Sequence, residues 1–107
     1  KCNFQGANLT EADLTTANLK EADLSRATLE NTTLSRANLS KANLAGARCI
    51  KASMTFANLN GCDLSRANLT SATFHGADLT KANLTSATTR EANFKNAKFI
   101  GTIGYKP

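Results

Sequence analysis

Histidine and acidic side chains are the groups in this sequence that could carry acid–base or metal chemistry. The single histidine, His75, follows Phe74 and precedes Gly76, so no base, acid or nucleophile converges on it along the chain. A catalytic or metal site needs several such groups within mutual reach. We therefore predict that His75 is a solvated surface residue, that the protein is not an enzyme, and that it holds no metal or cofactor.

Four aspartates could be imagined as paired carboxylates: Asp13, Asp23, Asp63 and Asp78. Asp23 and Asp63 both begin a D-L-S-R segment, with Arg26 and Arg66 three residues further on. The repeat described below would place these two carboxylates on one face, about 10 Å apart. That separation exceeds the retaining glycosidase spacing and lies at the edge of the inverting one. Turn hydrogen bonds and local ion pairs explain the aspartates better.

A period of five residues organises the whole sequence. Counted modulo five, all 13 leucines fall in one column, which also contains Phe4, Phe74, Phe94, Phe99, Cys49 and Met54. Two positions earlier runs a column of alanines from Ala7 to Ala97, interrupted only by Thr32 and Cys62. Asn or Asp occupies 13 of the 21 positions between these two columns. One unit of structure therefore repeats every five residues.

This period fits neither an α-helix nor a flat strand. Five residues turn about 500° in an α-helix, which would spread the leucines around its circumference. In a flat strand successive leucines would alternate between faces. Both apolar columns face inward if the chain bends once per repeat, and four bends close a 20-residue coil. We predict an all-β fold of about five stacked coils, a rod on the order of 25 Å long.

The glycines indicate where the bends lie. Five of the six, namely Gly6, Gly46, Gly61, Gly76 and Gly101, occupy the second position after the central apolar residue. A type II turn requires positive φ there, which glycine adopts at little cost. Asn31 and Asn96 share this column and tolerate the conformation next best. The column is therefore predicted to form the corners.

The motif A-[DN]-L-x-x closely resembles the consensus of the pentapeptide-repeat family, in register from Cys2 to about Gly101. The resemblance implies a right-handed quadrilateral parallel β-helix for residues 1–101, with a C-terminal cap or tail at 102–107. Each coil would bury its leucines only against its neighbours. Some family members resemble duplex DNA as acidic rods and inhibit or protect DNA gyrase. The formal charge of +5 argues against that activity for this chain.

The three cysteines are expected to be structural. Cys49 replaces a core leucine and Cys62 a core alanine, so both should be buried and unreactive. Cys2 and Cys62 would lie three coils apart, too far for a disulfide. Unpaired thiols slightly favour the cytoplasm. An exported or lumenal location would follow if an upstream signal segment was removed. No apolar run is long enough to span a membrane.

A basic, partly apolar region lies in the middle of the sequence. Residues 31–62 contain no acid and four bases: Arg36, Lys41, Arg48 and Lys51. These bases map to three sides of the rod, which argues against nucleic acid as the partner. Phe56 is the single aromatic residue of the corner column, and with Ile50 it could form an apolar patch. We therefore predict a protein-contact site at Arg48, Ile50, Lys51 and Phe56.

The repeat decays towards the C-terminus. Thr89 occupies a core position, and the segment after Lys98 breaks the pattern. A solenoid must shield its open end, and Ile100, Ile103 and Tyr105 are bulky enough to do so. These residues are predicted to cap the last coil or to contact a second copy. The N-terminal end shows no comparable cap, which suggests missing upstream residues or an end-to-end contact.

The leading interpretation is a non-catalytic protein-interaction or scaffold module, because a regular rod offers flat faces and no pocket. The alternative is a gyrase-interacting DNA mimic, which the positive charge disfavours. We expect a monomer or a weak end-to-end homodimer. Fold alone does not determine function, so the partner has to be sought at particular side chains.

Overall fold

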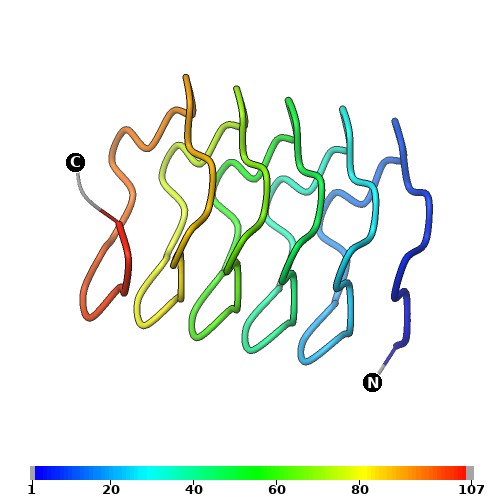
Figure 1. The fold of residues 1–107 in the computed structure, drawn as a ribbon, viewed down its shortest axis with the longest axis horizontal. Helices are drawn as coiled ribbons and strands as arrows, with labels where there is room; N and C mark the ends of the chain where they lie inside the picture. Colours follow the sequence, from blue (N-terminus) through cyan, green and yellow to red (C-terminus); the bar gives the residue numbers. More distant parts are fainter. Residues whose placement is uncertain (1, 106–107) are drawn as a thin grey trace.

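The computed structural model describes residues 2–105, which wind into a row of stacked coils (Figure 1). Its extents are 30 × 24 × 23 Å. Within residues 2–105 there is no helix and no continuous strand, and hence no helix that could cross a membrane. The chain is instead held by single-residue parallel bridges. Seventeen of them join residue i to residue i+20, from Asn3–Asp23 to Asn83–Ile103. The predicted 20-residue coil is confirmed.

The coil has four walls because the chain turns once per repeat. Each turn closes with a hydrogen bond from the alanine amide to the carbonyl of the central residue, as in Ala47 N to Leu44 O at 3.0 Å. All twenty corner residues from Gly6 to Gly101 have φ between +57° and +69°. Fifteen of them are not glycine, and they include arginine, lysine, glutamate and phenylalanine. The turn geometry therefore overrides the side-chain preference for negative φ.

The Asn/Asp column satisfies the one backbone amide that the bridges and turns leave free. In all thirteen cases the side-chain oxygen accepts a hydrogen bond from the amide two residues further on, as Asn58 does from Asn60 at 3.0 Å. Asn and Asp are the side chains that commonly make this local turn. In the middle coils, a repeat with Asn or Asp at this position therefore has a partner for each of its amides, as residues 38–42 do.

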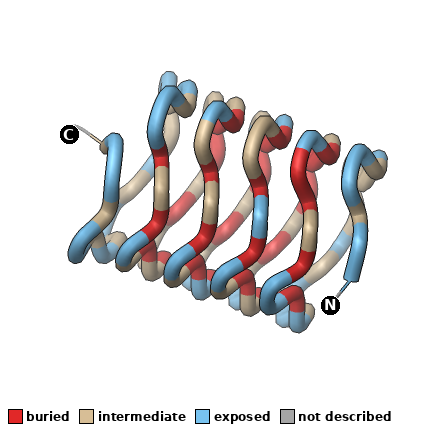
Figure 2. Tube along the Cα trace, turned by 60° about the horizontal axis from the view of Figure 1, so that its bottom comes forward, coloured by how far each residue is buried: buried red, intermediate tan, exposed pale blue. Residues whose placement is uncertain are grey.

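The core is a set of leucine and alanine ladders inside the coils. Leu24, Leu44, Leu64 and Leu84 form the predicted ladder on one wall, each 0–1% exposed. Figure 2 shows buried residues throughout the middle coils and none in the outermost ones. Towards the ends the same columns are only partly buried, as at Leu9 and Phe94. A coil is thus covered by the coils on both sides of it, as in other solenoids.

Candidate functional site

The wall of residues 32–36, 52–56 and 72–76 carries the most unusual exposed side chain. Phe56 is 50% exposed although it sits at a corner with φ +58°. Positive φ is costly for a bulky residue. Its ring is held in place by side chains one coil away on either side. The Arg36 guanidinium carbon lies 5.1 Å from the ring centroid, within cation–π range, and the His75 ring meets it edge-on at 5.5 Å.

Gly76 completes this arrangement by leaving room for the ring. A Cβ atom at Gly76 would lie 2.5 Å from the Phe56 ring, which real side chains do not tolerate. Phe56 therefore lies along the corner, over the backbone of the next coil. The Phe56 site, consisting of Phe56, Arg36, His75 and Gly76, presents a half-exposed aromatic ring that packs against its neighbours on both adjacent coils.

Hydroxyl groups cover the wall beside the Phe56 ring. Ser53 Oγ lies 3.3 Å from Ser35 Oγ and 3.4 Å from Thr55 Oγ1, so three hydroxyls form a continuous chain. All three residues are partly buried. A flat polar wall with an aromatic ring at its edge has the mixed character of a protein-contact surface.

The four residues predicted to contact a partner lie on or beside this wall. Lys51 and Phe56 occupy the two corners that bound residues 52–55, and both are exposed. Ile50 belongs to the preceding turn and is partly buried, while Arg48 projects from the neighbouring wall. The Phe56 ring contacts Arg36 and His75, which are 20 and 19 residues away in the chain.

His75 is therefore a structural neighbour of Phe56 and is partly buried rather than freely solvated. The aspartates serve their own turns. The hydroxyl and amide of Thr15 lower the pKa of Asp13, those of Ser25 lower the pKa of Asp23, and bonding by Thr80 lowers that of Asp78. Within residues 2–105 no three metal-ligating side chains come together.

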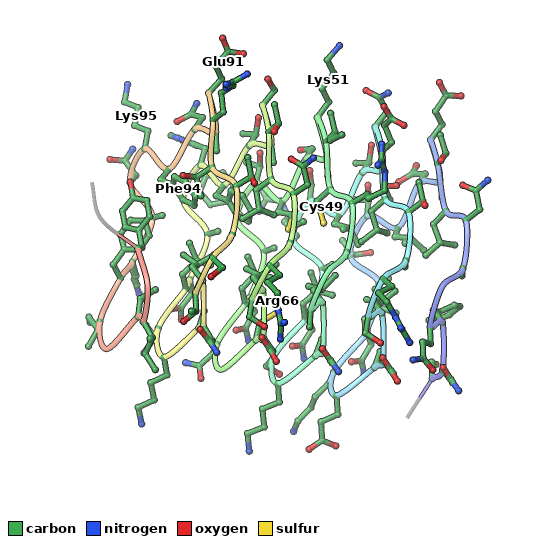
Figure 3. The ribbon with its side chains drawn as sticks, in the orientation of Figure 1. Cys49, Lys51, Arg66, Glu91, Phe94 and Lys95 are labelled. Carbon is green, nitrogen blue, oxygen red and sulfur yellow. The ribbon has the colours of Figure 1, made fainter. Side chains whose placement is uncertain are left out.

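Cys49 and Cys62 are buried at 0% and 1% exposure, as predicted, and Cys2 is exposed. Burial raises the pKa of the Cys49 thiol to about 12 and the pKa of Cys62 well above its usual value. Neither thiol is a nucleophile at neutral pH. Figure 3 shows Cys49 directed into the rod, whereas Lys51 and Glu91 project outward at one edge.

Aromatic rings gather at the C-terminal end of the rod. Phe94 stacks on Phe74 at 4.8 Å, and Tyr105 stacks on Phe99 at 4.4 Å with an interplanar angle of 5°. Figure 3 places Phe94 close to this end of the chain. The five-residue pattern would direct residue 105 outward, but Tyr105 turns over the core.

Gly104 makes the inward turn of Tyr105 feasible. A Cβ atom at Gly104, where φ is +82°, would lie 2.6 Å from the Thr85 backbone nitrogen. Of the other residues predicted to cap this end, Ile100 is 70% and Ile103 58% exposed. Backbone pairing continues to Ile103, two residues past the predicted boundary at 101. Residues 106–107 of the predicted tail lie outside the described part of the chain, as does Lys1.

These features define a solenoid class, the quadrilateral β-helix, and comparison with known proteins identifies the family. The pentapeptide repeat model matches eight copies, over residues 1–36, 22–55, 47–85 and 77–103. The chain belongs to the pentapeptide repeat family. No curated protein sequence matched it.

Solved structures of the family superpose well on the chain. HetL of Nostoc sp. strain PCC 7120, a pentapeptide repeat protein involved in heterocyst differentiation regulation, is 32% identical with a TM-score of 0.71 over 95% of this chain. Rfr23 of Cyanothece 51142 is 35% identical with a TM-score of 0.70 over 94%. A thylakoid-lumen protein of Arabidopsis thaliana is 27% identical with a TM-score of 0.55 over 81%. These similarities confirm the right-handed quadrilateral β-helix.

The chain spans 53% of HetL, 66% of Rfr23 and 64% of the Arabidopsis protein. It thus corresponds to a part of each of these proteins.

Proposed function

We propose that this protein is a non-catalytic interaction module that binds a protein partner across the wall between Lys51 and Phe56. The observation that carries the proposal is the Phe56 site, a half-exposed ring fixed by Arg36, His75 and Gly76. Aromatic residues that are already immobile lose little entropy on binding, and they are common interface hot spots. The pentapeptide repeat family is generally non-catalytic, which agrees with this role.

The charges around the site select the chemistry of the partner. The wall of residues 32–36, 52–56 and 72–76 carries Arg36 and no acid, and Lys51 stands at its other corner. Glu30 lies one coil from Ile50, across the Lys51 corner from this wall. Complementary charge steers association and disfavours basic partners. We therefore expect an acidic protein surface with an apolar depression that receives the Phe56 ring. The charge distribution does not favour the DNA-mimic alternative, which requires an acidic surface. One wall with its corner carries more bases than acids, namely Lys20, Lys41, Lys81 and Lys98 against Glu21 and Asp78.

Affinity purification with quantitative mass spectrometry tests this proposal. Proteins retained by the wild-type chain should be lost with Phe56→Ser, and lost or strongly reduced with Lys51→Glu. Gly76→Asn is a sharper variant, because asparagine accepts positive φ while its Cβ displaces the Phe56 ring. A hot-spot truncation costs about 2 kcal/mol or more, which corresponds to about thirtyfold in affinity.

The matched control is Lys81→Ser, a corner substitution on another wall, with thermal melts to verify folding of every variant. Ser71 and Ser86 show that serine is accommodated in this column. Identical sets of retained proteins for wild type, Phe56→Ser and Gly76→Asn would contradict the proposal.

A further inference from the structure

A cleft on a different wall combines two arginines with a floor that has almost no side chains. It is lined by Ser25, Arg26, Ala45, Gly46 and Arg66. Arg26 and Arg66 occupy the same corner of the rod two coils apart, since Asp23 pairs with Asn43 and Asn43 with Asp63. Their backbones are therefore separated by about 10 Å. Gly46 occupies the corner between them.

Arg26 leans over Gly46 in the direction of Arg66. A Cβ atom at Gly46 would lie 3.3 Å from Arg26 Cγ, so the aliphatic part of Arg26 rests on the glycine. A longer side chain at position 46 would occupy the space between the two arginines. In Figure 3 Arg66 lies on a different part of the rod from Lys51, so this cleft is separate from the Phe56 site.

Each aspartate of this wall has one carboxylate oxygen bonded within its own turn. Asp23 accepts hydrogen bonds from the Ser25 hydroxyl at 2.7 Å and amide at 3.0 Å, and Asp63 accepts one from the Ser65 amide at 2.9 Å. These Ser25 contacts lower the pKa of Asp23 most, and the charge of Arg26 contributes least. Asp23 is thus bonded within its own turn.

We propose that the cleft between Arg26 and Arg66 binds a phosphoryl group or a similar tetrahedral oxyanion. A guanidinium donates two parallel hydrogen bonds to an oxyanion at about 2.7–2.9 Å. Two such groups that grip one anion from opposite sides have their central carbons about 8 Å apart. The Arg26 and Arg66 backbones are about 10 Å apart, and their flexible side chains can bring the two guanidinium groups to this span across Gly46.

The shape of the anion distinguishes phosphate from carboxylate. A carboxylate presents both oxygens in one plane and on one side, so it satisfies one guanidinium fork well. A tetrahedral phosphate presents oxygens in several directions and can be held by both arginines. Its charge of nearly −2 also matches the two cations. The open cleft leaves room for the molecule to which the phosphoryl group is attached.

The rod contains its own control for nonspecific attraction. Lys41, Gly61 and Lys81 repeat the same alternation of cation and glycine at an adjacent corner. Lysine is a compact point charge without the planar fork. If charge alone attracts phosphate, the lysine corner and the arginine corner will bind it equally.

Titration of the full chain with inorganic phosphate, followed by amide NMR at constant ionic strength, tests the proposal. We expect saturable shifts centred on Gly46 and neighbouring amides, and only weak shifts with acetate. Arg26→Ser or Arg66→Ser should weaken binding about tenfold or more, since each removes charge-assisted hydrogen bonds. Arg26→Lys with Arg66→Lys keeps the charge but should also weaken it.

Gly46→Asn should fill the cleft while keeping both arginines, because Asn31 and Asn96 adopt the same φ in this column. The double variant Lys41→Ser, Lys81→Ser should leave phosphate binding within about twofold of wild type, by contrast with the arginine variants. Parallel titration with O-phosphoserine distinguishes the sources. Binding of both compounds indicates an attached phosphoryl group, and binding of inorganic phosphate alone indicates the free ion.

Unchanged phosphate binding in the arginine variants, or an equal loss in the lysine variant, would overturn the proposal. Equal shifts with acetate and phosphate would overturn the preference for a tetrahedral anion. The Phe56 site lies on another wall. A negative result for phosphate binding therefore leaves the protein-partner proposal intact, and the two proposals can fail independently.

Discussion

Leu44 in the middle of the rod and Phe94 near its C-terminal end occupy the same column of the repeat, yet they are covered differently. Leu44 is 0% exposed between the coils on either side of it. Phe94 is partly buried, and it relies on Phe74 below and Tyr105 above. Burial in this fold thus depends on how many neighbouring coils exist, and hardly on the local sequence. At the C-terminal end the Tyr105 ring covers the core, whereas in the middle the neighbouring coils do so.

The largest effect on stability is expected from a charged substitution in the core of the middle coils. Leu44→Asp buries a carboxyl group with no partner and should cost several kcal/mol, against a total stability of about 5–15 kcal/mol. We expect loss of the cooperative thermal transition. Leu9→Asp, at a partly buried site in the first coil, should keep a cooperative melt at lower temperature. Equal melts for the two variants would contradict the inward assignment of the central column.

The second effect concerns the extra ring at the end. Tyr105→Ala removes the stacking on Phe99 and the contact with Phe94, and should lower the free energy of unfolding by about 1–3 kcal/mol. Urea denaturation measures it. Ile100→Ala, at a 70% exposed side chain, should change stability by less than about 0.5 kcal/mol.

Deletion of residues 100–107 removes the entire C-terminal cap, and light scattering then measures self-association of the truncated chain. We expect the truncated chain to associate, because it exposes the aromatic end of the core. A truncated chain as stable and monomeric as the parent would refute the capping role.

The middle of the rod should also be sensitive to alkali. Burial raises the pKa of Cys49 from about 9 to about 12, so the unfolded state loses this proton first. Stability is therefore fully present below about pH 9 and declines as the pH rises towards 12, by at most about 1.4 kcal/mol per pH unit for one thiol. Urea melts from pH 8 to 11 should show it.

The control is Cys49→Leu with Cys62→Ala, which restores the common residue of each column. All other ionisable groups are common to the two proteins, so the difference between their pH profiles isolates the buried thiols. Parallel profiles would show that the thiols do not titrate with folding.

A small effect is expected at His75. His75→Ala removes an edge-on contact with Phe56 at 5.5 Å and should lower stability by less than about 1 kcal/mol. Folding should be preserved, and a thermal melt checks this. A loss comparable to that of Tyr105→Ala would mean that the Phe56 site contributes to the core rather than to the surface.

The sequence predicts most of the fold because one column of leucines and one of alanines force a bend every five residues. The corner column was also predictable from its glycines, and Phe56 and the charged residues of that column adopt the same positive φ. Propensity favours glycine and asparagine there, but the bridges to the adjacent coils impose the turn on every residue type.

The candidate site was predictable only in part, for a physical reason. Phe56 stands out by type, but the direction of its ring depends on Gly76 one coil later. Side chains of this fold interact across about 20 residues, so the neighbours of the Phe56 ring, Arg36 and His75, are far from it in the sequence. The inward turn of Tyr105 depends likewise on Gly104 passing close to the Thr85 backbone.

The constant 20-residue spacing of the bridges limits how such a chain can change its length during evolution. Duplication of 20 residues lengthens the rod by one coil and leaves every later side chain on its original wall. Insertion of five residues preserves the core but rotates everything downstream by a quarter turn. Such an insertion after Cys62 would carry Gly76 away from Phe56 and Arg66 away from Arg26, erasing both surfaces without unfolding the protein. Insertion of a single residue would instead move the leucines out of the core.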